Sequence, residues 1–306
     1  MDAIAAKKEA KSKKTAPARL LELSQHPDLS VQLTVAKHPS TPSAALEFLS
    51  IHGKPTVLKA VAAHPNTPSA TLERLAAHPH HAVRKALTSN LAPTPAILER
   101  LAGDGDWAVR SGVAAHHHCP VQTLQHLARN LNTEVRRSVA SNPNSPLETI
   151  RALSSDADDG VRRRTVQRLA QANQHDLIEI LASDEANEVR RAVAGCPSAI
   201  SARLATDPVA SVRQTVASRA DLETSTLNVL LADTDATVRW SLVFEKPTPT
   251  PAFVLEALST DPEEAVRYAV ASNKYTDRTI LESLTHDADS MVSEAARARL
   301  ERMKIQ

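Results

Sequence analysis

The 306-residue chain is 42% hydrophobic and 23% charged, which is the composition of a folded protein. Aromatic residues make up only 2% of it and glycines number six, which argues against one large ring-filled core and against glycine-rich phosphate-binding loops. Its two cysteines, Cys119 and Cys196, exclude a disulfide framework. The chain has no apolar run of about 18 residues and no secretory signal, so we expect a cytoplasmic protein with no membrane partner.

Charge is distributed unevenly along the chain. Residues 1–130 hold 15 Lys/Arg and 9 Asp/Glu, whereas residues 131–306 hold 21 and 26. Five lysines lie between Lys7 and Lys14, against the acidic Asp2 and Glu9. We expect residues 1–18 to be a basic, flexible N-terminal extension. Contact of these lysines with nucleic acid or another acidic surface is the alternative.

A valine recurs along the rest of the chain. It is found at Val31, Val57, Val83, Val109, Val135, Val161, Val189, Val212, Val238, Val266 and Val292. The first five intervals are all 26 residues, and from Val83 to Val266 each of these valines is followed by Arg. Another apolar residue follows four positions later in nearly every case, which places both on one stripe of a helix.

A second helix is predicted in each repeat. It follows a Ser/Thr-Pro pair, and we expect the hydroxyl residue to be the N-cap and the proline to be the first helical residue. Leucines then follow at helical spacing, as in Leu46 and Leu49. Helices of about nine residues are not stable alone in water. The sequence therefore predicts an all-α fold, a single α-solenoid of about eleven two-helix repeats over residues 19–306.

The repeats resemble a known family. Segments such as DGDWAVRSGVAAHHHCP and NTEVRRSVASNPNSPLETIRALSSD are similar to the leucine-rich repeat variant family of bacteria and to short HEAT repeats. Members of that family can carry an N-terminal iron–sulfur cluster bound by cysteines. This chain lacks those cysteines, so we expect no cofactor.

An Asp recurs six residues before the Arg that follows the valine. HEAT-like repeats use such a pair as a ladder that ties the turns of adjacent repeats, and we expect the same structural role here. The predicted ladder consists of Asp104/Arg110, Asp156/Arg162, Asp184/Arg190, Asp207/Arg213, Asp233/Arg239 and Asp261/Arg267.

The residue two positions after the valine points away from the core stripe. This row has a basic middle and an aromatic end, and exposed Trp, Tyr and Arg are typical of binding hot spots. We predict a concave binding face made of Lys59, Lys85, Arg137, Arg163, Arg191, Trp240 and Tyr268. A solvated face without a ligand is the alternative.

Histidines recur at two positions of the repeat. His38, His64 and His116 follow the first helix, where Asn90 and Asn142 stand in other repeats, and exchange with Asn indicates a turn hydrogen bond. The run from His116 to Cys119 suggests a metal site, but four consecutive residues cannot all face one ion. We therefore expect no bound metal.

No enzyme motif is present, so we expect no catalytic activity. We predict a repeat scaffold that binds a protein or peptide partner through its concave face. Nucleic-acid binding through the basic row and the lysines is the alternative. A third hypothesis is a DNA glycosylase, because the HEAT-like alkylpurine DNA glycosylases use Trp, Asp and Arg of a concave face, roles that Trp240 and Asp235 would take.

Overall fold

The computed structural model describes residues 2–90, 92–196, 200–244 and 249–303. In these residues the chain forms 23 helices and no strand, so the predicted all-α solenoid fold is confirmed. The chain divides into two compact units, unit 1 (residues 1–164) and unit 2 (residues 165–306), and each is described by itself. The prediction of one continuous solenoid over residues 19–306 stays a prediction. Within the described ranges, every helix is too short or too polar to cross a bilayer.

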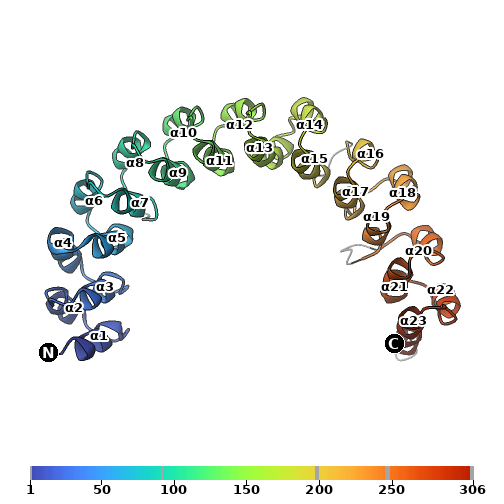
Figure 1. The fold of residues 1–306 in the computed structure, drawn as a ribbon, viewed down its shortest axis with the longest axis horizontal. Coiled ribbons are helices and arrows are strands. Elements are labelled where there is room, and N and C mark those ends of the chain that lie inside the picture. The colour runs from blue at the N-terminus through green and yellow to red at the C-terminus, as the bar shows by residue number, and fades with distance from the viewer. Residues whose placement is uncertain (1, 91, 197–199, 245–248, 304–306) are drawn as a thin grey trace. The chain divides into compact units, whose positions relative to one another are not determined.

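Unit 1 consists of two rows of helices. The odd-numbered helices form one row, and the even-numbered helices form a second row on its outer side (Figure 1). The helices are α1 (Ala3–Lys11), α2 (Pro17–Ser24), α3 (Leu29–Ala36), α4 (Ser43–His52), α5 (Pro55–Ala63), α6 (Ser69–Leu75), α7 (His81–Leu87), α8 (Pro95–Ala102), α9 (Trp107–Ala115), α10 (Val121–Leu127), α11 (Thr133–Ser141), α12 (Leu147–Leu153) and α13 (Asp159–Gln171), which begins in unit 1 and ends in unit 2.

Unit 2 repeats the same alternation. Its remaining helices are α14 (His175–Leu181), α15 (Asn187–Ala194), α16 (Ser201–Leu204), α17 (Ala210–Ala217), α18 (Thr224–Leu231), α19 (Ala236–Ser241), α20 (Ala252–Leu258), α21 (Glu264–Ser272), α22 (Arg278–Leu284) and α23 (Ser290–Met303). Successive odd-numbered helices pack on one another, as α17 does on α19 and α19 on α21.

The core of each unit is the predicted aliphatic stripe. Every valine of the recurring series is completely buried, and leucines of the even-numbered helices, such as Leu46 and Leu72, are buried against it. Burial of one such side chain contributes about 1.5–3 kcal/mol. Because each helix buries its stripe against neighbouring repeats, the repeats stabilise one another.

The helix starts differ in part from the prediction. Thr94 caps α8 and Pro95 is its first residue, as expected. At α4, α6 and α12 the proline is instead the N-cap. The residue before it is buried, and its hydroxyl donates to a carbonyl at the end of the preceding odd-numbered helix; Thr41 Oγ1, for example, donates to Val35 O at 2.6 Å. Val35 O also accepts from His38 N at 2.9 Å, so the hydroxyl adds a second hydrogen bond to a carbonyl at the helix end.

The N-terminal segment contains a helix that packs on the first repeat, and the prediction of a flexible extension over residues 1–18 stays a prediction. Residues 3–11 form α1, which packs on α3 and buries Ala6 and Ala10 completely. His38 Nε2 lies 3.1 Å from Ser12 O and ties the end of this segment to the first repeat. The sequence pattern did not indicate this packing, because the only side chains that α1 buries are two alanines.

An Arg–Asp ladder joins the turns of adjacent repeats, with a register that differs from the prediction. Arg213 donates Nη1 to the backbone oxygen of Asp207, six residues earlier, at 2.8 Å. Its Nε and Nη2 donate to the carboxylate of Asp233, in the following repeat, at 2.6 and 2.9 Å. The same two-point contact is made by Arg84–Asp104, Arg136–Asp156, Arg190–Asp207, Arg239–Asp261 and Arg267–Asp287.

The remaining predicted ladder residues, Arg162 and Asp184, take part in the same backbone contact that Arg213 makes with Asp207. Arg162 donates Nη1 to Asp156 O at 2.8 Å, and the backbone oxygen of Asp184 accepts from Arg190 at 2.8 Å. Arg84, Arg136, Arg190, Arg213, Arg239 and Arg267 therefore contact their own turn through the backbone and the next turn through a carboxylate. Spacing within one repeat could not show which turn supplies the carboxylate.

The ladder is interrupted between Arg110 and Asn130. Arg110 donates Nη1 to Asp104 O at 2.5 Å, but its buried Nε has no hydrogen-bond partner among the described residues. Asn130 stands where other repeats have the carboxylate, and its Oδ1 accepts from Asn132 N at 3.0 Å. The other polar atom of that side chain is an NH2 group, which donates and cannot accept from Arg110.

A second ladder joins the ends of the odd-numbered helices in unit 1. His64 Nδ1 accepts from Asn66 N, so Nε2 carries the hydrogen and donates to His38 O at 2.9 Å. Asn90 Nδ2 donates to His64 O at 2.8 Å, and His116 Nε2 donates to Asn90 O at 2.8 Å. All of these side chains are buried. The recurring His and Asn residues therefore make the predicted turn hydrogen bonds, and each bond connects two repeats.

We expect Asn130→Asp to stabilise the protein. The new carboxylate would accept from the unpartnered Arg110 Nε, and a hydrogen bond to a charged group contributes roughly 1.5–3 kcal/mol. Urea unfolding followed by circular dichroism should show a higher midpoint for this variant. Asn130→Ala is the control that adds no acceptor. A midpoint for Asn130→Asp at or below that of the natural chain would contradict the assignment.

The ladder carboxyls also predict acid sensitivity. Burial alone would raise the pKa of Asp207, but hydrogen bonds from Arg190 and from Val209 N outweigh burial and hold it below its ordinary 3.8. The pKa of Asp233 and that of Asp261 are lowered in the same way. A carboxyl whose pKa is lower in the folded state stabilises the fold above the unfolded pKa, and this contribution is lost as pH falls through the folded pKa.

We therefore expect the thermal midpoint to fall steeply below about pH 4. Asp233→Asn should lower the midpoint at neutral pH and make the loss on acidification smaller, because one titrating ladder carboxyl is gone. Calorimetry between neutral and acid pH measures both. An unchanged dependence on pH in Asp233→Asn would show that the ladder is not what titrates.

Candidate binding surface

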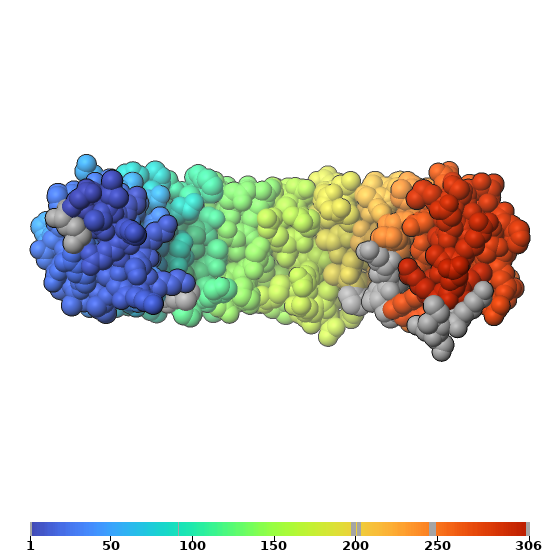
Figure 2. Space-filling view, turned by 90° about the horizontal axis from the view of Figure 1, so that it is seen from below, coloured from blue at the N-terminus to red at the C-terminus, as the bar shows by residue number. Residues whose placement is uncertain are grey.

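The predicted row lies on the odd-numbered helices, and none of its members belongs to the core. Lys59, Lys85, Arg137 and Arg163 are in unit 1, and Arg191, Trp240 and Tyr268 are in unit 2. Arg137 and Trp240 are half-buried, and the other five are exposed. Seen from the side of the odd-numbered helices, the C-terminal part of unit 1, in green, presents a continuous surface (Figure 2). A single row that runs through both units stays a prediction.

The row is less basic than its sequence indicates. Arg137 donates Nε and Nη2 to Asp158 at 2.9 and 2.8 Å and Nη1 to Glu134 at 2.6 Å. Arg191 pairs with Glu188 at 2.7 Å. These carboxylates were not part of the predicted row, and they neutralise two of its five cations. Lys59, Lys85 and Arg163 form no ion pair in the part of the chain that the structure describes.

The aromatic end of the row is larger than predicted. The rings of Trp240 and Phe244 stack, with centroids 3.9 Å apart and planes at 22°. Phe244 lines a groove of about 350 Å³ together with Tyr275, and Lys274 Nζ lies 4.8 Å from the centroid of the Tyr275 ring. We call Trp240, Phe244 and Tyr275 the aromatic cluster. Tyr268 is exposed on α21, the helix whose Ala269 and Ser272 line the same groove.

The cluster combines residues that are far apart in sequence. Trp240 and Phe244 are four residues apart, and Phe244 N donates to Trp240 O at 3.0 Å in the turn that follows α19, which places the two rings on one side. Tyr275 follows α21, and the sequence analysis missed it because it lies in the turn after the helix rather than at the row position. Among the described residues that line the groove, Lys274 is the sole charged one.

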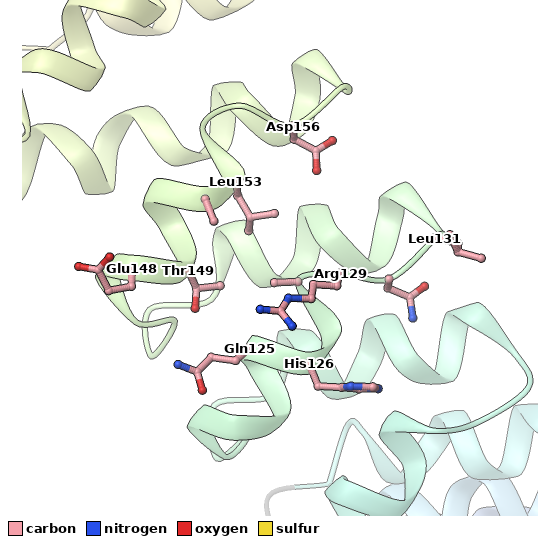
Figure 3. A pocket seen from close by; sticks show the side chains of 11 residues that line it. Gln125, His126, Arg129, Leu131, Glu148, Thr149, Leu153 and Asp156 are labelled. Carbon is pink, nitrogen blue, oxygen red and sulfur yellow. The ribbon is translucent and has the colours of Figure 1, made fainter.

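A second groove, of about 950 Å³, lies between α10 and α12 on the even-numbered side of unit 1 (Figure 3). Its lining is mixed: Gln125 and Arg129 come from α10 and the turn after it, and Thr149 comes from α12. Leu131 stands at its rim with a fully exposed side chain. This groove was not predicted from the sequence.

The side chains of the run from His116 to Cys119 do not point toward one common position. His116 is buried and takes part in the His/Asn ladder, whereas His117 and His118 are exposed. No group of three or more His, Cys, Asp or Glu residues that could hold a metal ion is found within the described residues. Burial raises the pKa of the Cys119 thiol to about 12 and also raises the pKa of Cys196.

Two segments, residues 55–80 and 133–158, match the leucine-rich repeat variant family. The chain contains leucine-rich repeat variant repeats. The matched segments include His64 of the buried His/Asn ladder and both members of the Arg136–Asp156 pair.

The fold is similar to that of a solved leucine-rich repeat variant described as having a novel repetitive structural motif. The identity is 25% and the TM-score 0.57, and the alignment covers 73% of this chain and 88% of that one. An engineered protein (17% identity, TM-score 0.32, 98% and 94% coverage) and importin beta (12%, 0.31, 95% and 40%) are more distant. None of the curated proteins compared matched the chain.

We expect both cysteines to be unreactive in the folded protein. A thiol whose pKa is about 12 is almost entirely protonated at pH 8, and only the thiolate is nucleophilic. Iodoacetamide should modify neither cysteine in the native protein and both in urea, as mass spectrometry would show. Rapid modification of native Cys119 would contradict its placement in the core.

Proposed function

We propose that the protein is a non-catalytic repeat scaffold that binds a protein or peptide partner, with the aromatic cluster of unit 2 as the main contact. One observation carries this proposal. All seven aromatic side chains lie in the described residues, and none belongs to the buried core. The core is built mainly from Val, Leu, Ile and Ala instead. Phe48 packs against it in unit 1, whereas the rings of the aromatic cluster lie outside the buried core.

Large rings at the surface are suited to binding. Phe244, Tyr268 and Tyr275 are 42%, 39% and 36% exposed, and Trp240 supports Phe244 from one side. Trp and Tyr are enriched in binding hot spots, because each buries much area with few rotatable bonds. A rigid ring pair beside a groove therefore favours recognition of an apolar side chain of the partner.

The two other hypotheses have less support. Nucleic-acid binding along the row is disfavoured because Arg137 and Arg191 are neutralised by neighbouring carboxylates. For a glycosylase, Asp235 would need to be available to a substrate. Its Oδ1 instead accepts from Thr237 N at 2.8 Å and from Thr237 Oγ1 at 2.6 Å, so this carboxylate serves as the N-cap of α19.

We expect peptides selected against the full chain from a random library to depend on the aromatic cluster. Phe244→Ala and Trp240→Ala should each weaken binding by about 2 kcal/mol or more, roughly thirtyfold, as truncation of a hot spot does. Isothermal titration calorimetry measures the affinity, and the thermal midpoint should change little because neither ring is in the core.

The matched control is Phe253→Ala, which removes the same ring type with a similar exposure of 37% from α20, outside the cluster. It should leave the affinity unchanged. The proposal fails if Phe253→Ala weakens binding as much as Phe244→Ala. It also fails if the selected peptides bind all three variants as tightly as the natural chain.

A further inference from the structure

The N-terminal end of unit 1 presents a concentrated positive charge. Five lysines lie within eight residues in and just after α1, and all are exposed; we call Lys7, Lys8, Lys11, Lys13 and Lys14 the lysine face. Unit 1 as a whole carries 21 Lys/Arg and 14 Asp/Glu, a net charge of +7, whereas unit 2 carries 15 and 21. The lysine face is thus part of the basic unit of the chain.

The fold holds the lysine face in place. Ala6 and Ala10, four residues apart, are completely buried where α1 packs on α3. Lys7, Lys8 and Lys11 lie at helical spacing on the opposite side. The turn that carries Lys13 and Lys14 is tied to α1, because Thr15 Oγ1 donates to Glu9 O at 2.5 Å. The lysines therefore project from a docked helix rather than from a loose tail.

The nearby carboxylates do not neutralise these lysines. Glu9 accepts from Arg19 Nε at 2.8 Å, and Glu22 accepts from Arg19 Nη1 at 2.5 Å. Asp2 caps the start of α1. In the described ranges, none of the five lysines forms an ion pair. Arg19, its two carboxylate partners and Asp2 thus have a structural role within the fold. The five lysines make no described intramolecular contact that would give them such a role.

An exposed apolar side chain shares this face. Ile4 is 78% exposed and precedes Lys7, Lys8 and Lys11 by three, four and seven residues, so all four lie on one side of α1. Lysines around an isolated aliphatic side chain suit an anionic lipid surface, where the ammonium groups meet the headgroups and the aliphatic group enters the interface. A nucleic-acid backbone would use the lysines and leave Ile4 without a role.

We propose that the lysine face and Ile4 dock unit 1 reversibly onto a membrane surface rich in anionic phospholipid. This is a peripheral contact of a docked helix, distinct from a membrane-spanning segment, and it is independent of the aromatic cluster in unit 2. A lysine close to such a surface contributes about fivefold in affinity, so three lysines contribute roughly a hundredfold.

The test measures co-sedimentation of the full chain with vesicles of phosphatidylserine in phosphatidylcholine and with vesicles of phosphatidylcholine alone. We expect binding only to the first kind, with an affinity that falls as salt rises. Replacing Lys7, Lys8 and Lys11 together by Gln should reduce the affinity roughly a hundredfold. Circular dichroism should be unchanged, because none of the three is buried.

The matched control replaces Lys54, Lys59 and Lys85 by Gln, which removes the same charge from exposed positions elsewhere in unit 1. It should reduce vesicle binding far less. Ile4→Ser should weaken binding to the anionic vesicles about tenfold while leaving binding to a DNA duplex unchanged. This variant separates a lipid surface from a general attraction to polyanions.

Three results would overturn the proposal. The first is no binding to the phosphatidylserine vesicles at physiological salt. The second is an equal loss in the two triple-lysine variants, which would show only the net charge of unit 1. The third is vesicle binding that does not depend on Ile4, together with tighter binding to the DNA duplex, which would assign the lysine face to nucleic acid instead.

Discussion

The burial of one aliphatic stripe against the next repeat is the interaction on which the rest of the structure depends. Most helices have seven to ten residues, and helices of that length are unstable alone in water. The recurring valines are completely buried only because a neighbouring repeat covers them. Stability in such a stack is approximately the sum of the stability of each repeat and that of each contact between neighbours.

Two polar ladders accompany this burial and form hydrogen bonds to polar groups that it brings near the core. Repeat turns bring backbone carbonyls and charged groups close to the core, where an unsatisfied polar atom is costly. Six ladder arginines, Arg213 among them, contact the backbone of their own turn and the carboxylate of the next, and the buried His and Asn side chains bond to carbonyls of the preceding repeat. At Arg110 and Asn130 the chain departs from this pattern, which makes that contact between repeats a sensitive place to measure what one rung contributes.

Because small and aliphatic side chains fill the core, the surface is where the chain places its unusual residues. The stacked pair of Trp240 and Phe244, beside the groove with Tyr275, lies in the acidic unit 2. The lysines of α1 lie at the N-terminal end of the basic unit 1. The two proposals concern different units, surfaces and partner chemistries, so each can fail without affecting the other. Together they describe a scaffold with a place for a partner in one unit and a membrane contact in the other.

The repeat, its helical periodicity, the buried valines and the role of the recurring His and Asn residues could be predicted from the sequence, because these depend on local spacing and side-chain type. Which turn supplies the carboxylate to each arginine could be read only from the folded chain. The sequence pattern allows either Asp207 or Asp233 to pair with Arg213. The tertiary structure also decided that Asp158 and Glu134 neutralise Arg137, that Tyr275 joins Phe244, and that α1 is docked through two alanines. Each of these depends on how one repeat is positioned against the next, and the spacing within a single repeat does not encode that position.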